Sequence, residues 1–220
     1  MRAILIPVKD LARAKQRLAG VLPQEQRTAL ARAMMADVFA AVAGVDPAVR
    51  VFVVSGDAGA LAAAEARGWE CLPETTQISE SASVDEASRI CAARGVTALL
   101  RLPIDIPLVR AADIEEVLAA CPSAPAAVLV PSRTGDGTNA LLRTPPDAFR
   151  SRFGSDSLPK HQQEAGRMGV SVRILHNPRI ALDVDDEADL RALGEQREMG
   201  VHVRSALHGL ALPLVARAAG

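Results

Sequence analysis

The chain has 220 residues, of which 49% are hydrophobic, and its formal net charge is -1. This length and apolar content predict one α/β domain with a substantial core. The near-neutral charge gives no general attraction to nucleic acid or to an anionic membrane, so phosphate recognition has to be local. Aromatic residues make up only 2% of the chain, which leaves few stacking platforms for single-stranded nucleic acid. We therefore exclude nucleic-acid-binding and membrane-binding classes.

The cysteines and the first strand indicate an intracellular protein. Cys71, Cys91 and Cys121 are odd in number and form no C-x-x-C pair, so neither a disulfide framework nor a zinc site is expected. The apolar run Ala3–Val8 is too short for a secretory signal, and Lys9 follows it directly. We expect a cytoplasmic location.

Strand-like and helical runs alternate through the first half of the chain. After the strand Ala3–Val8, a helix is expected near residues 23–43, because apolar residues recur every four positions from Leu30 to Val42. This alternation predicts a mainly parallel sheet with helices on both faces. The other elements expected here are strands at Val51–Ser55, Glu70–Leu72 and Ala98–Leu102 and helices near residues 58–67, 84–94 and 111–120.

The pattern changes after residue 126, where two short strands separated by a glycine-containing loop predict a β-extension of the main sheet. We assign residues 1–194 to one domain and residues 195–220 to a C-terminal helical tail, whose apolar residues offer a surface for a homodimer contact. The elements expected here are strands at Ala127–Val130, Asn139–Leu142, Val170–Leu175 and Ile180–Leu182 and helices near residues 158–165 and 187–193.

A basic loop follows the first strand. It contains Lys9, Lys15 and Arg17. In open α/β sheets ligands bind at the carboxyl ends of the strands, so these cations are placed to neutralise a triphosphate and departing pyrophosphate. The alternative is a solvated basic turn that leads into the first helix.

Three aspartates follow other predicted strands. Asp105 is a lone carboxylate in a proline-bracketed apolar segment, and Asp183 and Asp185 are alternate residues after the predicted strand Ile180–Leu182, so they point the same way. Mg2+ is a natural reason to hold such carboxylates together, since it takes one or two protein carboxylates and completes its shell with water and phosphate oxygens. The alternative is that they cap turns and helices.

Two further segments suit an anion. One is the glycine-rich loop that leads to Thr138, and the other contains Gly154 and Ser157 before a short helix with free N-terminal amides. His161 lies one turn into that helix, where it either aids an anion site or is a surface histidine. Helix caps and ordinary hairpin loops are the alternatives for both segments.

Together these segments resemble the phospho-acid guanylyltransferases of deazaflavin coenzyme biosynthesis, from about Ile6 to Leu190. The motifs that carry the resemblance are Pro-Val-Lys followed by Ala-Lys-x-Arg-Leu at 7–18, Asp-x-Pro-Leu at 105–108, Gly-Thr-Asn-Ala-Leu at 137–141, Phe-Gly-x-x-Ser-x-x-x-His at 153–161 and Leu-Asp-Val-Asp at 182–185. The resemblance implies a Rossmann-like nucleotidyltransferase fold. It also implies GTP and a small three-carbon phospho-acid as substrates.

The resemblance implies roles for single residues. Asp105, Asp183 and Asp185 match metal-binding aspartates, Lys9 and Lys15 match positions that face the nucleotide phosphates, and Thr138, Gly154 and Ser157 match positions that hold the acceptor. Asp85 falls in the segment of the base pocket, where relatives often have Asn, and Ser132 stands where relatives often have Asp. A carboxylate at position 85 accepts hydrogen bonds from guanine N1–H and the amino group but cannot donate to O6.

The expected reaction is attack by the acceptor phosphate on the α-phosphorus of GTP, with release of pyrophosphate. The acceptor is 2-phospholactate, phosphoenolpyruvate or 3-phosphoglycerate, and the sequence does not decide among them. Two alternatives stay open at this point: a nucleotidyltransferase of the same fold with a sugar phosphate or pterin as acceptor, and a catalytically silent binding protein.

Overall fold

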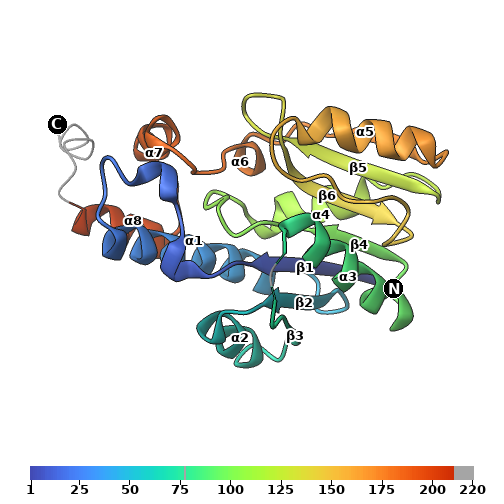
Figure 1. Ribbon diagram of the computed structural model, residues 1–220, viewed down its shortest axis with the longest axis horizontal. Coiled ribbons are helices and arrows are strands. Elements are labelled where there is room, and N and C mark those ends of the chain that lie inside the picture. Colours follow the sequence, from blue (N-terminus) through green and yellow to red (C-terminus); the bar gives the residue numbers. More distant parts are fainter. Residues whose placement is uncertain (77, 211–220) are drawn as a thin grey trace.

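The computed structural model describes residues 1–76 and 78–210, and these form a seven-stranded sheet flanked by helices (Figure 1). The strands lie in the order β3-β2-β1-β4-β6-β5-β7. Their bounds are β1 (Arg2–Val8), β2 (Arg50–Ser55), β3 (Glu70–Pro73), β4 (Ala98–Arg101), β5 (Ala126–Pro131), β6 (Thr138–Thr144) and β7 (Ser171–Ile174).

The sheet is mainly parallel, as predicted. β1 pairs in parallel with β2 and β4, β2 with β3, and β5 with β7. Among the described strands only β6 is antiparallel to its neighbours, β4 and β5, and β5 and β6 form the predicted β-extension. Because β6 runs against β4, the start of β6 at Thr138 lies at the same edge of the sheet as the carboxyl end of β4. This edge holds the functional site.

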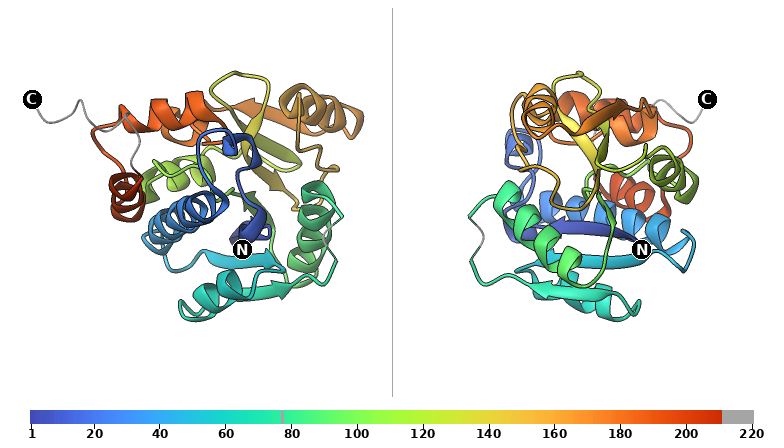
Figure 2. Two further views of the ribbon diagram at one scale, coloured as in Figure 1. Left: turned by 60° about the vertical axis from the view of Figure 1, so that its left-hand side comes forward. Right: turned by 90° about the vertical axis from the view of Figure 1, so that its right-hand side faces the viewer.

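Helices cover both faces of the sheet. α1 and α3 lie on opposite sides of β1 (Figure 2). Alternation along β1 explains this, because Ile4 and Ile6 pack in the core with α1 and α4, whereas Ala3 and Leu5 face α3. The helices are α1 (Gln24–Ala43), α2 (Ala58–Glu65), α3 (Glu80–Ala93), α4 (Ala111–Ala119), α5 (Ser157–Arg167), α6 (Pro178–Ala181), α7 (Glu187–Gly194) and α8 (Val201–Gly209), with 3-10 turns at Leu11–Arg13 and Gln16–Leu18.

The predicted strand Ile180–Leu182 is wrong. These residues belong mainly to the short helix α6, because the Asn177 side chain accepts hydrogen bonds from the N–H groups of Arg179 and Ile180 and Pro178 fits the first helical turn. The chain becomes extended again at Leu182. Asp183 and Asp185 therefore lie in an extended segment between α6 and α7, not at the end of a strand.

α3 begins four residues earlier than predicted. The Ser79 hydroxyl caps it by accepting from the N–H of Ala82 at 3.1 Å. The earlier start places Glu80 in the first turn of α3, beside the sheet edge that holds the functional site.

Part of the predicted tail is packed on the domain. α8 lies along α1, and Val203, Leu207 and Leu210 are buried in a cluster with residues of α1 and α7. The Asp37 carboxylate on α1 accepts from the N–H of Val203 at 2.8 Å and of His202 at 3.1 Å, which caps α8. A homodimer stays a prediction; of the apolar tail residues offered for its contact, Leu212, Leu214 and Val215 lie outside the described residues.

Of the helices in the described part of the chain, none has both the length and the apolar character that crossing a membrane requires. The cytoplasmic location remains a prediction.

Candidate active site

Two adjoining cavities form a crevice at this edge of the sheet. The N-terminal cavity, of about 420 Å3, lies against the loop after β1. The C-terminal cavity, of about 520 Å3, lies against the loop before β6, the start of α5 and the segment before α7. The two cavities share a wall that is formed by Lys9, Arg17, Glu80, Arg101, Pro103, Asp105 and Asp185. The structure thus brings both predicted groups of charged residues into one continuous site.

Lys15 joins the basic loop to the acidic residues. Its backbone is left-handed, with φ of 53°, between the two 3-10 turns, and its side chain is buried. The ammonium group lies 2.8 Å from Asp105 Oδ2 and 2.9 Å from Asp185 Oδ1. Burial alone lowers the pKa of Lys15, but the charges of Asp105 and Asp185 outweigh burial and raise the pKa above its ordinary value. Lys15 is therefore a permanent cation at the centre of the crevice.

The three predicted aspartates converge on this centre. The Val184 N–H donates to the backbone oxygen of Asp105 at 3.0 Å, and Val184 points into the core, so Asp183 and Asp185 both face the crevice. Burial raises the pKa of Asp105, yet Lys15 outweighs burial and holds the pKa below its ordinary range. The predicted common orientation of Asp183 and Asp185 holds, although the element before them is a helix.

Of the three aspartates, Asp183 is the one that forms no salt bridge within the described residues, since Asp105 and Asp185 both pair with Lys15. It accepts one hydrogen bond, from Asn139 Nδ2 at 3.1 Å. Burial, followed by the negative charge of Asp105, raises the pKa of Asp183 above its ordinary value. The Asn139 amide also donates to the carbonyl oxygens of Ile180 and Ala181, so it fixes α6 and Asp183 together. A half-buried carboxylate with like charges nearby suits a cation that phosphate oxygens help to hold.

No ready-made cation cage exists in the described chain, because no group of three or more His, Cys, Asp or Glu side chains is arranged to hold a metal ion. Lys15 occupies the space between Asp105 and Asp185. This donor set fits Mg2+ better than it fits a structural metal, since Mg2+ uses one or two carboxylates and keeps water and phosphate ligands. The magnesium requirement stays a prediction.

Arg101, at the end of β4, is a candidate that the sequence reading did not name. Its buried guanidinium donates to Asn139 O at 2.9 Å, pairs with Glu80 and lies 4.2 Å from the ring centroid of Phe153. Glu80 also pairs with Lys9 at 3.3 Å. Arg101 Nε is buried and has no hydrogen-bond partner in the described residues. The sequence feature that could have identified Arg101 is its place inside an apolar strand. A buried charge is costly unless it is paired, so such an arginine is expected to have a specific partner or role.

Arg17 lies on the wall between the two cavities and is exposed. Within residues 1–76 and 78–210 it forms no hydrogen bond or ion pair, in contrast to Lys15 and Lys9. Arg17 is therefore a free cation at the crevice.

The two predicted anion segments meet in the C-terminal cavity. Thr138 and Ser157 are both buried, and the Thr138 N–H donates to Ser157 Oγ at 2.8 Å. Gly154 has φ of 110°, which only glycine adopts readily, and this turns the chain into α5. In the described chain the N–H groups of residues 154–157 donate to no protein acceptor. Free amides and hydroxyls at a helix N-terminus form a cradle for an anion.

His161 is fully buried behind this cradle, so the surface alternative is wrong. Its Nδ1 lies 3.0 Å from Thr138 Oγ1, and its Nε2 accepts from the N–H of Arg152 at 2.8 Å. His161 does not line the cavity itself. It contacts the cradle from the core side.

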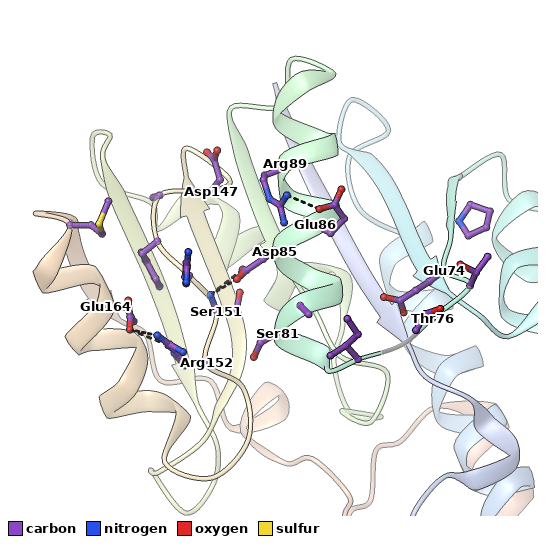
Figure 3. A pocket seen from close by; sticks show the side chains of 18 residues that line it. Glu74, Thr76, Ser81, Asp85, Glu86, Arg89, Asp147, Ser151, Arg152 and Glu164 are labelled. Atoms are coloured by element: carbon purple, nitrogen blue, oxygen red, sulfur yellow. Dashed lines mark hydrogen bonds and ion pairs between the residues drawn. The ribbon is translucent and has the colours of Figure 1, made fainter.

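Asp85 lies apart from this crevice. It lines a separate groove between α3 and residues 147–152 (Figure 3). Its carboxylate accepts from the Ser151 N–H at 3.0 Å and pairs with the buried Arg143 at 3.3 Å. Asp85 is thus the counter-ion of a buried arginine. The structure does not bring it to Lys9, Lys15 and Arg17, and its contact with a nucleotide base stays a prediction.

The fold and this site define an enzyme of the nucleotidyltransferase class. A putative nucleotide-diphospho-sugar transferase from Desulfovibrio desulfuricans G20 superposes with a TM-score of 0.73 at 17% identity, covering 95% of each chain. A nucleotidyl transferase from Methanothermobacter thermautotrophicus superposes with a TM-score of 0.62 at 14% identity, covering 95% of this chain and 99% of the other. These similarities establish the fold.

The chain belongs to the family described as guanylyl transferase CofC like, whose model matches residues 1–206. It is 36% identical to a phosphoenolpyruvate guanylyltransferase from Conexibacter woesei, over 94% of this chain and 95% of the relative. It is 38% identical to a protein of the same name from Rubrobacter xylanophilus, over 86% and 91%. A 2-phospho-L-lactate guanylyltransferase from Methanothermobacter thermautotrophicus is 33% identical, over 94% and 89%. The resemblance that the motifs indicated is confirmed.

Proposed function

We propose that this enzyme transfers GMP from GTP to the phosphate of a small three-carbon phospho-acid and releases pyrophosphate, as a step in deazaflavin coenzyme biosynthesis. The observation that carries the proposal is the division of the crevice. Lys15 lines the N-terminal cavity, and a hydroxyl and amide cradle lines the C-terminal cavity together with Asp183. The wall that the two cavities share carries Lys9, Arg17, Asp105 and Asp185. The names of the relatives, phosphoenolpyruvate and 2-phospho-L-lactate guanylyltransferase, support the phospho-acid.

The proposed reaction needs alignment and charge neutralisation. A phosphate monoester is largely dianionic near neutral pH, because its second pKa is about 6, so the attacking oxygen needs no general base. This agrees with the crevice, whose only histidine neighbour, within the described residues, is His161 behind the cradle. The catalytic task is to hold two anions in line and to disperse their charge.

The N-terminal cavity is assigned to GTP. Lys9 and Arg17 lie on its wall as exposed cations, and Lys15 is held permanently charged between two carboxylates. These groups offset the charge that builds on departing pyrophosphate. Asp105, Asp183 and Asp185 are the residues that would hold Mg2+, which when bound supplies charge to neutralise the reacting phosphates.

The C-terminal cavity is assigned to the acceptor. Thr138 and Ser157 present hydroxyls, and residues 154–157 present free amides, which together match the oxygens of a phosphate and a carboxylate. The proposal favours phosphoenolpyruvate as the acceptor, because that name is carried by the relatives at 36% and 38% identity.

A pyrophosphate-release panel tests the proposal. It crosses GTP and ATP with phosphoenolpyruvate, 2-phospholactate and 3-phosphoglycerate, with and without Mg2+. We expect release that requires GTP, one of the acids and Mg2+ together. Release with ATP at equal efficiency contradicts the guanylyl assignment, and absence of release with every acid contradicts the acceptor class.

A further inference from the structure

The tautomer of His161 follows from its two hydrogen bonds. The N–H of Arg152 is a backbone donor that lies 2.8 Å from Nε2, so Nε2 has to accept and carries no proton. A neutral imidazole carries its proton on the other nitrogen. Nδ1–H therefore donates to Thr138 Oγ1 at 3.0 Å.

This bond decides what the Thr138 hydroxyl does. Its oxygen already accepts from His161, and no acceptor in the described part of the chain takes its proton. Ser157 shows the same arrangement, since its oxygen accepts from the Thr138 N–H. Both hydroxyls line the C-terminal cavity with one of their two acceptor lone pairs used and with a proton that no acceptor in the described residues takes, so each has its proton available for a ligand.

We propose that His161 is a positioning residue that fixes the Thr138 hydroxyl as a hydrogen-bond donor toward the anionic acceptor substrate; this inference rests on the function proposed above. The histidine does not touch the substrate. It acts through Thr138 and favours a ligand that presents an acceptor oxygen at this point, such as a phosphate or a carboxylate.

The surroundings of His161 keep the ring neutral and oriented. The ring packs edge-on against Phe153, with centroids 4.9 Å apart, and has no exposed surface. Burial first, and then the positive charges of Arg143, Arg101 and Arg152, lower the pKa of His161 to about 3. The ring therefore stays neutral and the tautomer does not change near neutral pH.

A buried histidine that only fills the core is the competing explanation, and two substitutions separate it from the proposal. His161→Asn places an amide N–H near the position of Nδ1, so it still donates to Thr138 but no longer accepts from Arg152. His161→Gln places its carbonyl near the position of Nε2, so it accepts from Arg152 but cannot donate to Thr138. Both remove the ring from the core.

The measurement is the dependence of pyrophosphate release on phospho-acid concentration, with GTP binding followed by calorimetry. We expect His161→Gln and Thr138→Val each to lower kcat/KM for the acid by about tenfold or more. His161→Asn is expected to stay within about threefold of the wild type. GTP affinity should change little in all three variants.

Imidazole 15N NMR of the wild-type protein provides the second readout, and it holds even where a variant does not fold. We expect His161 as the Nδ1–H tautomer at pH 7. An Nε2–H tautomer, or equal loss of acid efficiency in the Asn and Gln variants with wild-type turnover intact, overturns the role of His161. A wild-type protein that releases no pyrophosphate with any acid contradicts the proposed function instead.

Discussion

At the residue scale, Asp105 and Asp183 differ in whether an ion pair compensates their negative charge. Asp105 is neutralised by Lys15 at 2.8 Å, whereas Asp183 accepts from the Asn139 amide and forms no ion pair within the described residues. The motifs indicated the convergence of these residues on one site. The sequence did not reveal that Lys15 would reach Asp105 and Asp185, because this contact depends on the left-handed backbone of Lys15 between two short turns.

This difference predicts opposite stability effects for two matched variants. Asp183→Asn should lower turnover by more than about a hundredfold, since the charge serves the reacting phosphates. It should leave the melting temperature unchanged or higher, because the raised pKa of Asp183 shows that burial and Asp105 penalise its charge. Asp105→Asn should lower both turnover and melting temperature, because it removes one of the two charges that stabilise buried Lys15.

Activity assays and thermal unfolding of both variants check this. Near-normal turnover in Asp183→Asn contradicts the assignment of Asp183, and equal destabilisation by the two variants contradicts the electrostatic account.

His161 predicts a pH dependence of stability. Its pKa is about 3 in the folded protein and about 6.5 in the unfolded chain, so between these values only the unfolded chain binds the extra proton. The contribution of His161 to stability is therefore greatest above about pH 6.5 and falls as the pH is lowered toward 3. The loss attributable to His161 between pH 7.5 and 5.5 is about 1.4 kcal/mol.

Urea unfolding of the wild type and of His161→Gln at these two pH values measures this loss. We expect the wild type to lose about 1.4 kcal/mol more than the variant, in which the titrating group is absent. Equal losses of unfolding free energy in the two proteins would show that the pKa of His161 does not differ between the folded and unfolded states.

At the element scale, the periodicity of apolar residues was sufficient to predict the long helix α1, but it did not identify the short helix α6. α1 was predicted almost to the residue because its apolar stripe continues from Leu30 to Val42, but α6 is four residues long and its apolar residues suit a strand equally well. The local signal for α6 was Asn177 followed by Pro178, which is typical of a helix start. α3 started early for a similar reason, since Ser79 is a cap that precedes its apolar stripe.

The docking of α8 on α1 gives a prediction at this scale. Asp37→Ala removes the acceptor for two N–H groups at the start of α8, so unfolding free energy should fall by about 1 kcal/mol. For a chain of this length that is roughly 2–4 °C in Tm. Glu86→Ala, in an exposed ion pair on α3, is the control and should change Tm by less.

Thermal unfolding of the two variants and the wild type measures these changes in Tm, and activity assays of the same samples are run alongside. A Tm equal to that of the control would show that the Asp37 cap adds little to the stability of the domain.

At the scale of the whole molecule, the sheet topology explains why motifs far apart in sequence form one site. Parallel β1 and β4 end at the same edge, and antiparallel β6 starts there, so Lys15, Asp105 and Thr138 meet. The order of the motifs along predicted strands made this convergence predictable. The roles of Glu80 and Arg101 were not predictable, because their ion pair depends on how α3 packs beside β4. The separation of Asp85 from the crevice was not predictable for the same reason, because it also depends on how α3 packs against the sheet.

The central claim, that GMP passes from one half of the crevice to an acid in the other, is tested most directly with GTP labelled at the α-phosphorus. The purified enzyme is incubated with this GTP, Mg2+ and phosphoenolpyruvate, and the labelled products are separated. The account predicts that the label moves into a new product that forms only when the acid is present, together with one unlabelled pyrophosphate for each transfer. Label that remains in GTP, or that appears in GMP or GDP whether or not the acid is added, would contradict it.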